Sequence, residues 1–256
     1  MMQNIERIRV LNVPVDVLTM ENAVEYACCS AKDRGKVSSI VAVNPEKSFA
    51  MQQFEEIRVF IENADLVIPD GIGIVFGAKI LHGRKMERVP GADLMQEICR
   101  VSGQRKIRIF VFGAKEEVNA GAVEKLRVRF PDIQIAGRRN GYIGENEMEG
   151  LIREINDSNA DLVFIALGSP RQERWINMYA SKLNVGACMG IGGTLDTITG
   201  NVKRAPKFMQ NIHLEWFYRL VKQPARFWRN RLVFIFGIRI LFVKISKIAT
   251  GGGSMF

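Results

Sequence analysis

The stretch ADLVIPDGIGIVFGAKIL at residues 64–81 decides the fold class of this chain. An apolar run from Leu66 to Ile68 meets Pro69-Asp70-Gly71, and a second apolar run with helical character follows. Continuous apolar strands, without polar alternation, are typical of parallel sheets that are covered on both faces. The stretch therefore predicts a buried strand, a turn that carries a carboxylate, and a helix.

The same order of strand and helix recurs along the chain. Strands are predicted at 37–44, 65–70, 106–113, 161–169 and 185–193, with a short one inside 133–144. Helices are predicted at 45–64, 71–83, 115–131, 147–159 and 171–183. Repeated alternation of this kind predicts an α/β fold, Rossmann-like, with a mostly parallel sheet and helices on both faces.

The chain is expected to divide near residue 200. Residues 1–200 form the predicted catalytic core, in two halves at about 1–105 and 106–200. Residues 201–250 form a basic, amphipathic helical appendage, which Pro224 is expected to break into two helices, and residues 251–256 a flexible end. The apolar run from Leu232 to Val243 is too short for a spanning helix, which needs about 20 residues. We expect it to lie on a membrane surface, or else to pack on the core.

The net positive charge of the chain comes from this appendage. Residues 201–256 hold eleven Lys and Arg and one acid, Glu215, whereas the other 200 residues hold 25 basic and 26 acidic groups. A localised cationic segment predicts an anionic partner, which can be a membrane surface, a diphosphate or a nucleic acid.

Cysteine and histidine usage favours neither disulfides nor a metal centre. The residues concerned are Cys28, Cys29, Cys99, Cys188, His82 and His213. They show no metal-ligand spacing, and adjacent cysteines are poorly placed to pair, so we expect reduced thiols. The charged N-terminus lacks the apolar segment of a signal peptide, and we expect a cytoplasmic protein.

The residues just after the strands are the candidates for ligand binding, because open α/β sheets bind ligands at the carboxyl ends of their strands. The loops are Asn44–Glu46, Asp70–Gly73, Gly113–Lys115, Gly168–Glu173 and Gly190–Thr194. Four of the five contain glycine, which lets backbone N–H groups approach phosphate oxygens. A ligand with a diphosphate is therefore predicted. Neither G-x-G-x-x-G in its required context nor a Walker pattern occurs, which disfavours an NAD enzyme or an ATPase.

Four polar residues stand out at these loops, each with more than one interpretation. Asp70 could cap the following helix, bind a metal, or act as a general base toward a hydroxyl. Asn44 and Gln172 could bind sugar hydroxyls or cap their loops. Arg88, ahead of a predicted helix start, could be a surface cation.

Seven motifs together resemble the WecG/TagA/CpsF glycosyltransferases. In order they are VNPEKS, ADLVIPDGIGIVFGAKIL, ERVPGADLM, VFGAKEEV, ALGSPRQERWI, GIGGTLDTITGNVKRAPKFMQ and LEWFYRLVKQPARFWR, and the similarity spans residues 8–230. The resemblance implies an inverting transfer of a sugar, N-acetylmannosamine first, from a UDP-sugar to a sugar such as N-acetylglucosamine on undecaprenyl diphosphate. It implies bacterial cell-wall or surface polysaccharide synthesis, teichoic acid included, with UDP-glucose or UDP-N-acetylmannosamine uronic acid as alternative donors.

The resemblance also implies roles for individual residues. Asp70 is the expected catalytic base, and Asn44, Arg88 and Gln172 are the other expected catalytic residues. The residues expected to bind substrate are Gly71, Gly113, Gln172, Gly192, Gly193, Asp196, Arg219, Arg226 and Arg229. Some members have a threonine where this chain has Ala42, so a hydroxyl contact is missing there.

The expected partners are the UDP-sugar, the polyprenyl-diphosphate acceptor and the anionic inner face of the plasma membrane. No cofactor is expected, and with no D-x-D motif after a strand the transfer is predicted to be metal-independent. No nucleic acid is expected, because the body is neutral and the appendage has a long aliphatic run. A homo-oligomer stays open. The competing functions are a nucleotide-sugar oxidoreductase or epimerase, which would bind NAD, and a nucleic-acid-binding protein with salt-sensitive affinity.

Overall fold

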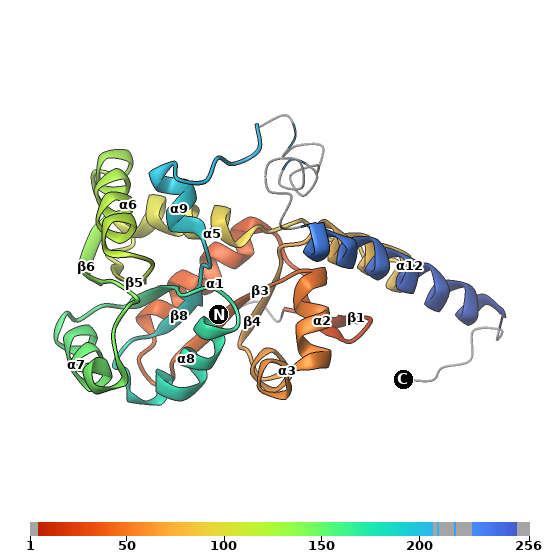
Figure 1. Ribbon diagram of the computed structural model, residues 1–256, viewed down its shortest axis with the longest axis horizontal. Coiled ribbons are helices and arrows are strands. Elements are labelled where there is room, and N and C mark those ends of the chain that lie inside the picture. The colour runs from red at the N-terminus through yellow and green to blue at the C-terminus, as the bar shows by residue number, and fades with distance from the viewer. Residues whose placement is uncertain (1–4, 207–208, 210–217, 219–226, 250–256) are drawn as a thin grey trace.

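A six-stranded parallel sheet forms the centre of the protein, as the computed structural model in Figure 1 shows. The structure describes residues 5–206, 209, 218 and 227–249. The strand order is β4-β3-β8-β7-β5-β6, and all neighbouring strands run parallel. The strands are β3 (Ser38–Val43), β4 (Leu66–Pro69), β5 (Arg108–Gly113), β6 (Gln134–Arg139), β7 (Leu162–Ala166) and β8 (Ala187–Gly190). The predicted α/β class is confirmed.

Strands β4 and β7 are as deeply buried as their apolar runs predict. Every residue of β4 and of β7 is buried. In the register of β3 with β4, Val43 lies opposite Pro69, so the two strands end side by side. The next residues along the chain, Asn44 and Asp70, therefore leave the sheet at neighbouring points.

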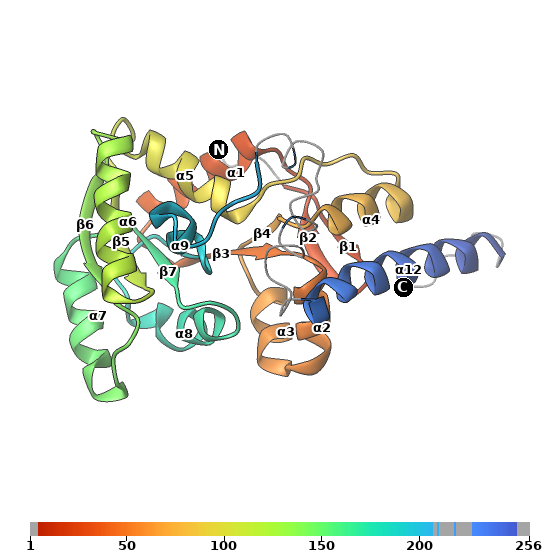
Figure 2. The ribbon, with the colours of Figure 1, turned by 45° about the horizontal axis from the view of Figure 1, so that its top comes forward.

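Helices cover both faces of the sheet, which Figures 1 and 2 show from two directions. One face packs against α2 (Pro45–Gln53), α3 (Glu55–Glu62), α7 (Met148–Asp157) and α8 (Arg171–Tyr179). The other packs against α1 (Met20–Lys32), α5 (Gly91–Ser102), α6 (Glu116–Arg129) and α9 (Thr194–Thr199). The helices after β7 and after β5 thus lie on opposite faces, which opens a crevice between these adjacent strands at the carboxyl edge.

One predicted helix is wrong in its extent. The single helix predicted over 45–64 is two helices, α2 and α3, which meet at Phe54. Phe54 has an extended backbone (φ −125°, ψ 113°), and its N–H donates to the carbonyl of Ala50 to close α2. Its half-buried ring packs on the core, and this tertiary contact replaces the glycine or proline that would have marked the break.

An N-terminal hairpin, which the sequence did not predict, extends the structure beyond the edge strand β4. Strands β1 (Arg7–Val10) and β2 (Val13–Asp16) pair antiparallel. The Asp16 carboxylate accepts hydrogen bonds from Arg7 and from the backbone N–H of Val67 in β4. Helix α4 (Ile72–His82) packs on β1.

The long C-terminal helix α12 (Phe227–Ala249) lies alongside α4, and together they form an arm (Figure 2). Phe236 and Ile240 of α12 are buried. Other apolar residues of the same helix are exposed, namely Phe234, Ile235, Ile238, Leu241, Phe242 and Ile245. One side of α12 therefore packs on the core, which was the alternative to a position on a membrane surface. Another side faces outward. Within the described residues, no helix has the length and hydropathy to cross a membrane. The predicted break at Pro224 lies outside the described residues.

The remaining global expectations concern cysteines and domains. All four thiols are free, and three of them, Cys28, Cys99 and Cys188, are buried, as predicted. Burial raises the pKa of Cys99 and of Cys188 to about 12, so both stay protonated near neutral pH.

The predicted boundary near residue 105 falls between α5 and β5, inside one continuous sheet. The proposed domain limits stay predictions.

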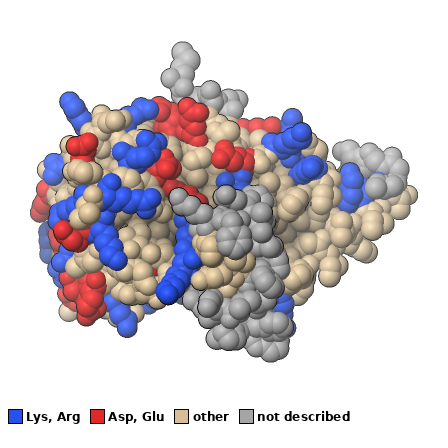
Figure 3. Space-filling model, turned by 90° about the horizontal axis from the view of Figure 1, so that it is seen from above, with Lys and Arg blue, Asp and Glu red and all other residues tan. Residues whose placement is uncertain are grey.

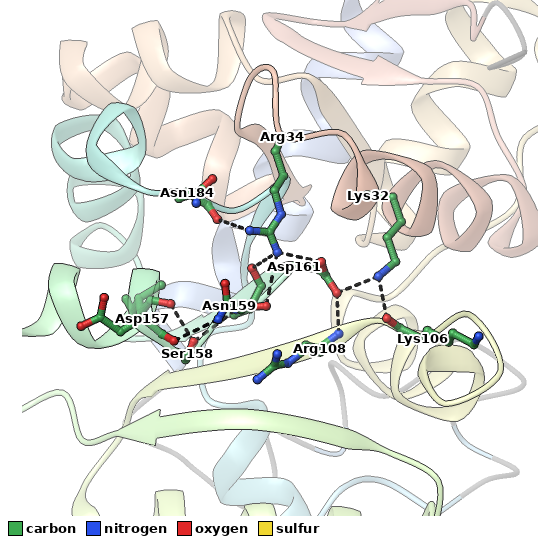
Figure 4. Close-up of polar contacts among 11 residues, drawn as sticks. Lys32, Arg34, Lys106, Arg108, Asp157, Ser158, Asn159, Asp161 and Asn184 are labelled. Atoms are coloured by element: carbon green, nitrogen blue, oxygen red, sulfur yellow. Dashed lines mark hydrogen bonds and ion pairs between the residues drawn. The ribbon is translucent and has the colours of Figure 1, made fainter.

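The buried carboxylate of Asp161 holds together several segments at the amino end of the sheet (Figure 4). This end lies opposite the carboxyl edge, where ligands are expected to bind. Asp161 directly precedes β7, and its Oδ2 accepts hydrogen bonds from Lys32 Nζ and from the backbone N–H of Arg108, both at 2.8 Å. Its Oδ1 accepts from Arg34 Nη2 at 3.1 Å. Burial by itself raises the pKa of Asp161, but the donors from Lys32, Arg108 and Arg34 outweigh it, and the pKa is lowered from its ordinary 3.8.

Replacing Asp161 with asparagine is expected to lower the free energy of unfolding by about 2–3 kcal/mol, because hydrogen bonds to a charged acceptor are each worth about 1.5–3 kcal/mol. A lowered pKa means that this stabilisation is present above pH 3.8 and is lost as the pH falls through the folded-state value. Urea denaturation at about pH 7 and about pH 3 checks this, since the gap between wild type and variant should shrink at the lower pH. The exposed Asp132→Asn is the control. Equal stabilities at both pH values would contradict the assignment.

Candidate functional site

Two groups of predicted residues lie at the carboxyl edge of the sheet. The first group follows β3 and β4 and contains Asn44, Asp70 and Gly71, with Arg88 beside them. The second group follows β5, β7 and β8 and surrounds a pocket. One contact described below, the ion pair of Lys47 with Glu173, connects the loops of the two groups.

Asp70 joins the end of β4 to the start of α5. Its side-chain Oδ1 accepts a hydrogen bond from the backbone N–H of Gly91, the first residue of α5, at 3.1 Å. The interpretation of Asp70 as the cap of the helix that follows it is wrong, because the N-cap position of α4 is occupied by Gly71. The carboxylate instead caps a helix that begins 21 residues further along the chain.

Arg88 holds the same turn from the other side. Its Nε donates to the backbone carbonyl of Asp70 at 2.8 Å, and the N–H of Val89 donates to the carbonyl of Pro69 at 2.9 Å. Arg88 is half-buried, so the alternative of a surface cation is wrong. The segment before α5 therefore runs against the end of β4 and fixes where the Asp70 backbone lies.

Asn44 and Gly71 are in direct contact. The Asn44 side chain caps α2 by accepting from the backbone N–H of Lys47 at 3.0 Å, which is the structural one of its two interpretations. A Cβ on Gly71 would lie 2.8 Å from the Cβ of Asn44 and 2.8 Å from the Cδ of Pro45. Gly71 is therefore glycine because the Asn44 loop approaches its backbone too closely for a side chain.

Gln172 connects the loops after β7 and β8. Its side chain is buried, its Oε1 accepts from the backbone N–H of Gly192 at 2.9 Å, and its Nε2 donates to Glu173 Oε1 at 3.1 Å. A Cβ on Gly190 would lie 2.4 Å from Gln172 Nε2. In this structure Gln172 thus fixes the β8 loop, which is the capping alternative predicted for it.

A buried ion pair, which the sequence did not reveal, spans the two groups. Lys47 Nζ in the first turn of α2 contacts Glu173 Oε1 in the first turn of α8. The side chains are 10% and 1% exposed. The pair ties the loop after β3 to the loop after β7, across the intervening strand β8.

The second group encloses a pocket of about 240 Å³. It is lined by Ala114, Lys115, Val118, Gly141, Tyr142, Ala166, Leu167, Gly168, Arg171, Gly192, Gly193 and Asp196. The predicted residues Gly192, Gly193 and Asp196 are thus together in its wall. Lys115, Tyr142 and Arg171 were not predicted, although Lys115 and Arg171 stand in the predicted loops.

The wall between β5 and β7 depends on Gly113 and Asn119. Gly113 has φ +114°, and a Cβ there would lie 2.6 Å from the carbonyl carbon of Ala166, so both conformation and space require glycine. The buried Asn119 side chain donates from Nδ2 to the carbonyl of Gly113 at 2.9 Å and to that of Arg139 at 3.1 Å. Gly113 therefore shapes the pocket rather than lining it.

The pocket has the properties of an anion site with an aromatic rim. Helices α6 and α8 begin at the pocket, and helix N-termini favour negative charge through their free N–H groups. The exposed cations Lys115 and Arg171 add positive charge. Tyr142 is 68% exposed and presents a flat ring on which a base can stack.

The remaining predicted positions belong to the appendage or concern metals. Arg219 and Arg226 lie outside the described residues. Arg229 falls in the first turn of α12, and its side chain is outside the described part. In the part of the chain that the structure describes, no cluster of three or more His, Cys, Asp or Glu has the arrangement to hold a metal ion.

Comparison with known proteins places this geometry among sugar transferases. Residues 8–249 match the model of the glycosyl transferase WecG/TagA/CpsF family. The chain is 35% identical over 221 residues to the N-acetylglucosaminyldiphosphoundecaprenol N-acetyl-beta-D-mannosaminyltransferase of Bacillus subtilis (strain 168), covering 86% of this chain and 85% of the relative. It is 38% identical over 200 residues to the protein of the same name from Bacillus spizizenii, covering 78% and 77%.

Proposed function

Because the chain belongs to the WecG/TagA/CpsF family of glycosyltransferases, we propose that it transfers N-acetylmannosamine from its UDP derivative to undecaprenyl-diphosphate-linked N-acetylglucosamine. The observation that carries the proposal is the match to two relatives named for this transfer, at 35% and 38% identity, over most of each chain. The reaction would build the linkage unit of a teichoic-acid-type cell-wall polymer.

In the proposed reaction the anomeric carbon of the sugar is inverted. An acceptor hydroxyl oxygen attacks that carbon, the bond to the UDP oxygen breaks, and UDP leaves with the bonding electrons. The Asp70 carboxylate takes the hydroxyl proton as general base. Its position supports this role, since it stands at the end of β4, held through its backbone by Arg88 and through Oδ1 by the N–H of Gly91.

The pocket after β5, β7 and β8 would hold the UDP. The N-termini of α6 and α8, with Lys115 and Arg171, would face the diphosphate and stabilise the charge that develops on leaving. Tyr142 would stack on the uracil, and the Asp196 carboxylate would accept hydrogen bonds from ribose hydroxyls. Gly192 and Gly193 would let the β8 loop approach the phosphates, while Gln172 fixes that loop.

Asn44 and Arg88 would act mainly by position. Asn44 caps α2 next to Gly71, and Arg88 contacts the Asp70 carbonyl, so both set where the proposed base lies. The appendage arginines Arg219, Arg226 and Arg229 would bind the acceptor diphosphate. Transfer is proposed to need no metal.

A panel of UDP-sugars, incubated with a synthetic lipid-diphosphate-N-acetylglucosamine and followed by UDP release, tests the function. Release with UDP-N-acetylmannosamine alone, dependent on acceptor and retained in EDTA, is the expected result. Release with UDP-glucose or with the uronic-acid donor would keep the reaction class and change the donor sugar. The donor sugar is open because Ala42 stands where some family members have a threonine. No acceptor-dependent release with any donor would overturn the proposal.

Gly71→Ala is expected to lower kcat about 10-fold or more while leaving the KM for the UDP-sugar nearly unchanged, because small displacements of catalytic groups are costly. The new Cβ would meet Asn44 and Pro45 at 2.8 Å, so the backbone beside Asp70 must shift, whereas the nucleotide pocket is built from other loops. Steady-state kinetics measure both constants. Gly150→Ala, where a Cβ meets nothing within 4 Å, is the control. A rise in KM without a change in kcat would contradict the expected role.

The arm of α4 and α12 supports a peripheral position on the inner face of the plasma membrane. Neither helix contains an Asp or Glu, and α12 alone carries Arg229, Arg231, Arg239, Lys244 and Lys247. Figure 3 shows blue and tan atoms along the arm at the right of the view. Phe76 of α4 is exposed, as is the apolar side of α12. Cations near an acidic leaflet are worth about 1 kcal/mol each.

Sedimentation with vesicles tests this location. Binding to vesicles with about 30% anionic lipid, weakened by salt and by Phe242→Asp, is expected, because the surface potential of anionic lipid attracts the cations and falls with ionic strength. Val128→Asp places the same charge at an equally exposed site on α6 and should bind as the wild type does. Binding to single-stranded DNA but not to vesicles would favour the nucleic-acid alternative.

A further inference from the structure

The buried side of α12 meets α4 through two pairs of residues. Phe236 and Ile240 lie one helical turn apart and are 0% and 2% exposed. On α4, Gly73 and Gly77 are also one turn apart. A Cβ on Gly73 would lie 3.4 Å from Phe236 Cδ1, and a Cβ on Gly77 would lie 3.0 Å from Ile240 Cδ1. Gly73 thus leaves room for Phe236, and Gly77 leaves room that Ile240 shares with Val10 of β1, whose Cγ1 would lie 2.3 Å from a Cβ on Gly77.

The pairing also fixes the direction of α12. Because Phe236 meets Gly73 and Ile240 meets Gly77, the two helices run parallel. Phe236 lies about two and a half turns after the start of α12, so these first turns extend past the start of α4, toward the edge of the sheet where Asp70 lies. Figure 2 shows α12 beside α4 in this arrangement.

The same helix contacts α2, the helix that follows Asn44. The Arg239 guanidinium lies 4.9 Å from the centre of the Phe49 ring, and its Nη1 donates to Gln52 Oε1 at 3.1 Å. The space at Gly73 is closed on its other side by Pro45, whose Cγ would lie 2.9 Å from a Cβ there. One side of α12 thus contacts both helices that begin directly after the proposed catalytic loops.

We propose that the seating of α12 on α4 positions Asp70 and Asn44 for transfer, with Phe236 and Ile240 as the positioning residues. The inference rests on the proposed function for the role of Asp70, although the mechanical coupling does not. Asp70 and Gly71 are the two residues between the end of β4 at Pro69 and the start of α4 at Ile72, so a shift of α4 is passed directly to them. The packing of α4 therefore holds this turn from its carboxyl side, beside the bonds that Val43 and Arg88 make to its backbone, and Phe236 packs on the first turn of α4.

Amide hydrogen exchange on the full chain tests the coupling without reference to activity. Phe236→Ala and Ile240→Ala should speed exchange of the amides of residues 71–77 at least 10-fold, since a cavity loosens the α4 turn, and leave β5 and β7 unchanged. Phe242→Ala and Ile238→Ala, on the exposed side of the same helix, should change neither region. Unchanged exchange at residues 71–77 in both buried-side variants, with α12 still helical, would overturn the proposal.

Kinetics with a short-chain acceptor in detergent give the second readout. The buried-side variants should lose about 10- to 100-fold in kcat with the KM for the UDP-sugar nearly unchanged, and Phe236→Leu should recover most of the loss. Val128→Ala is the activity control. Faster exchange at residues 71–77 with wild-type kcat would also overturn the proposal. An inactive wild type would instead overturn the proposed function, and the exchange result would still decide the coupling.

Discussion

Replacing Asp70 with asparagine should lower kcat by about 10²–10⁴-fold, the range that a positioned general base contributes. Asparagine keeps an oxygen that can accept the hydrogen bond from the Gly91 N–H, so the start of α5 stays capped. The amide cannot take the acceptor proton. The nucleotide pocket lies after β5, β7 and β8, away from the end of β4, so the KM for the UDP-sugar should change little.

The comparison with two other aspartates makes this result specific. Asp196→Asn, in the pocket wall, should raise the KM for the UDP-sugar with a smaller effect on kcat. The exposed Asp132→Asn should behave as the wild type does. Thermal unfolding of all three variants checks that the fold is intact. Near-normal kcat in Asp70→Asn, with the same acceptor, would remove Asp70 from the chemistry and leave it as the cap of α5.

The central sheet could be predicted from sequence because its strands carry their own signal. The runs at 66–69 and 162–166 are apolar on both faces, and the structure buries β4 and β7 throughout. The order of strands could not be predicted, since β8 is inserted between β3 and β7 by contacts far apart in the chain. The hairpin of β1 and β2 was missed because its strands, RIRV and VPVD, contain charged residues and a proline in place of a continuous apolar run. Helix α1 was missed as well, although Thr19 caps it.

Features set by tertiary contacts had no local signal. Phe54 ends α2 through an extended backbone and core packing, where the sequence shows neither glycine nor proline. The sequence of helix α12 is apolar and basic along its length, and contacts with α4 and α2 determine that Phe236 and Ile240 face inward. A local pattern can indicate that such a helix is amphipathic, but the surface it packs on belongs to another part of the chain.

The candidate site could be predicted in part, because its loops follow strands that the sequence reveals. The rule that ligands bind after parallel strands predicted the loop of Gly192 and Gly193, the family resemblance predicted Asp196, and all three line one pocket. The roles of Asn44 and Gln172 as structural contacts, with Lys47 N–H and with Gly192 N–H, became clear only from the geometry. Whether these residues also contact a sugar stays a prediction. Tyr142, on the rim, follows a strand by three residues and had no motif to single it out.

The ion pair of Lys47 and Glu173 should have the largest effect on stability among the side chains at the carboxyl edge. Glu173→Gln is expected to lower the free energy of unfolding by about 3–5 kcal/mol, the usual cost of leaving one buried charge without its partner. The Lys47 ammonium is 10% exposed and would remain in the interior without the carboxylate. Glutamine can still accept from Gln172 Nε2, so that hydrogen bond is kept.

A double-mutant cycle separates the lost ion pair from other damage. Lys47→Met with Glu173→Gln has no buried charge at this point, so it should recover about 2 kcal/mol or more of the loss. Denaturant titration of wild type, both single variants and the double variant gives the coupling energy. If the single changes add without coupling, Lys47 and Glu173 do not stabilise each other. Strong coupling would mean that the loop beside the proposed base and the loop beside the nucleotide pocket are fixed to each other by charge.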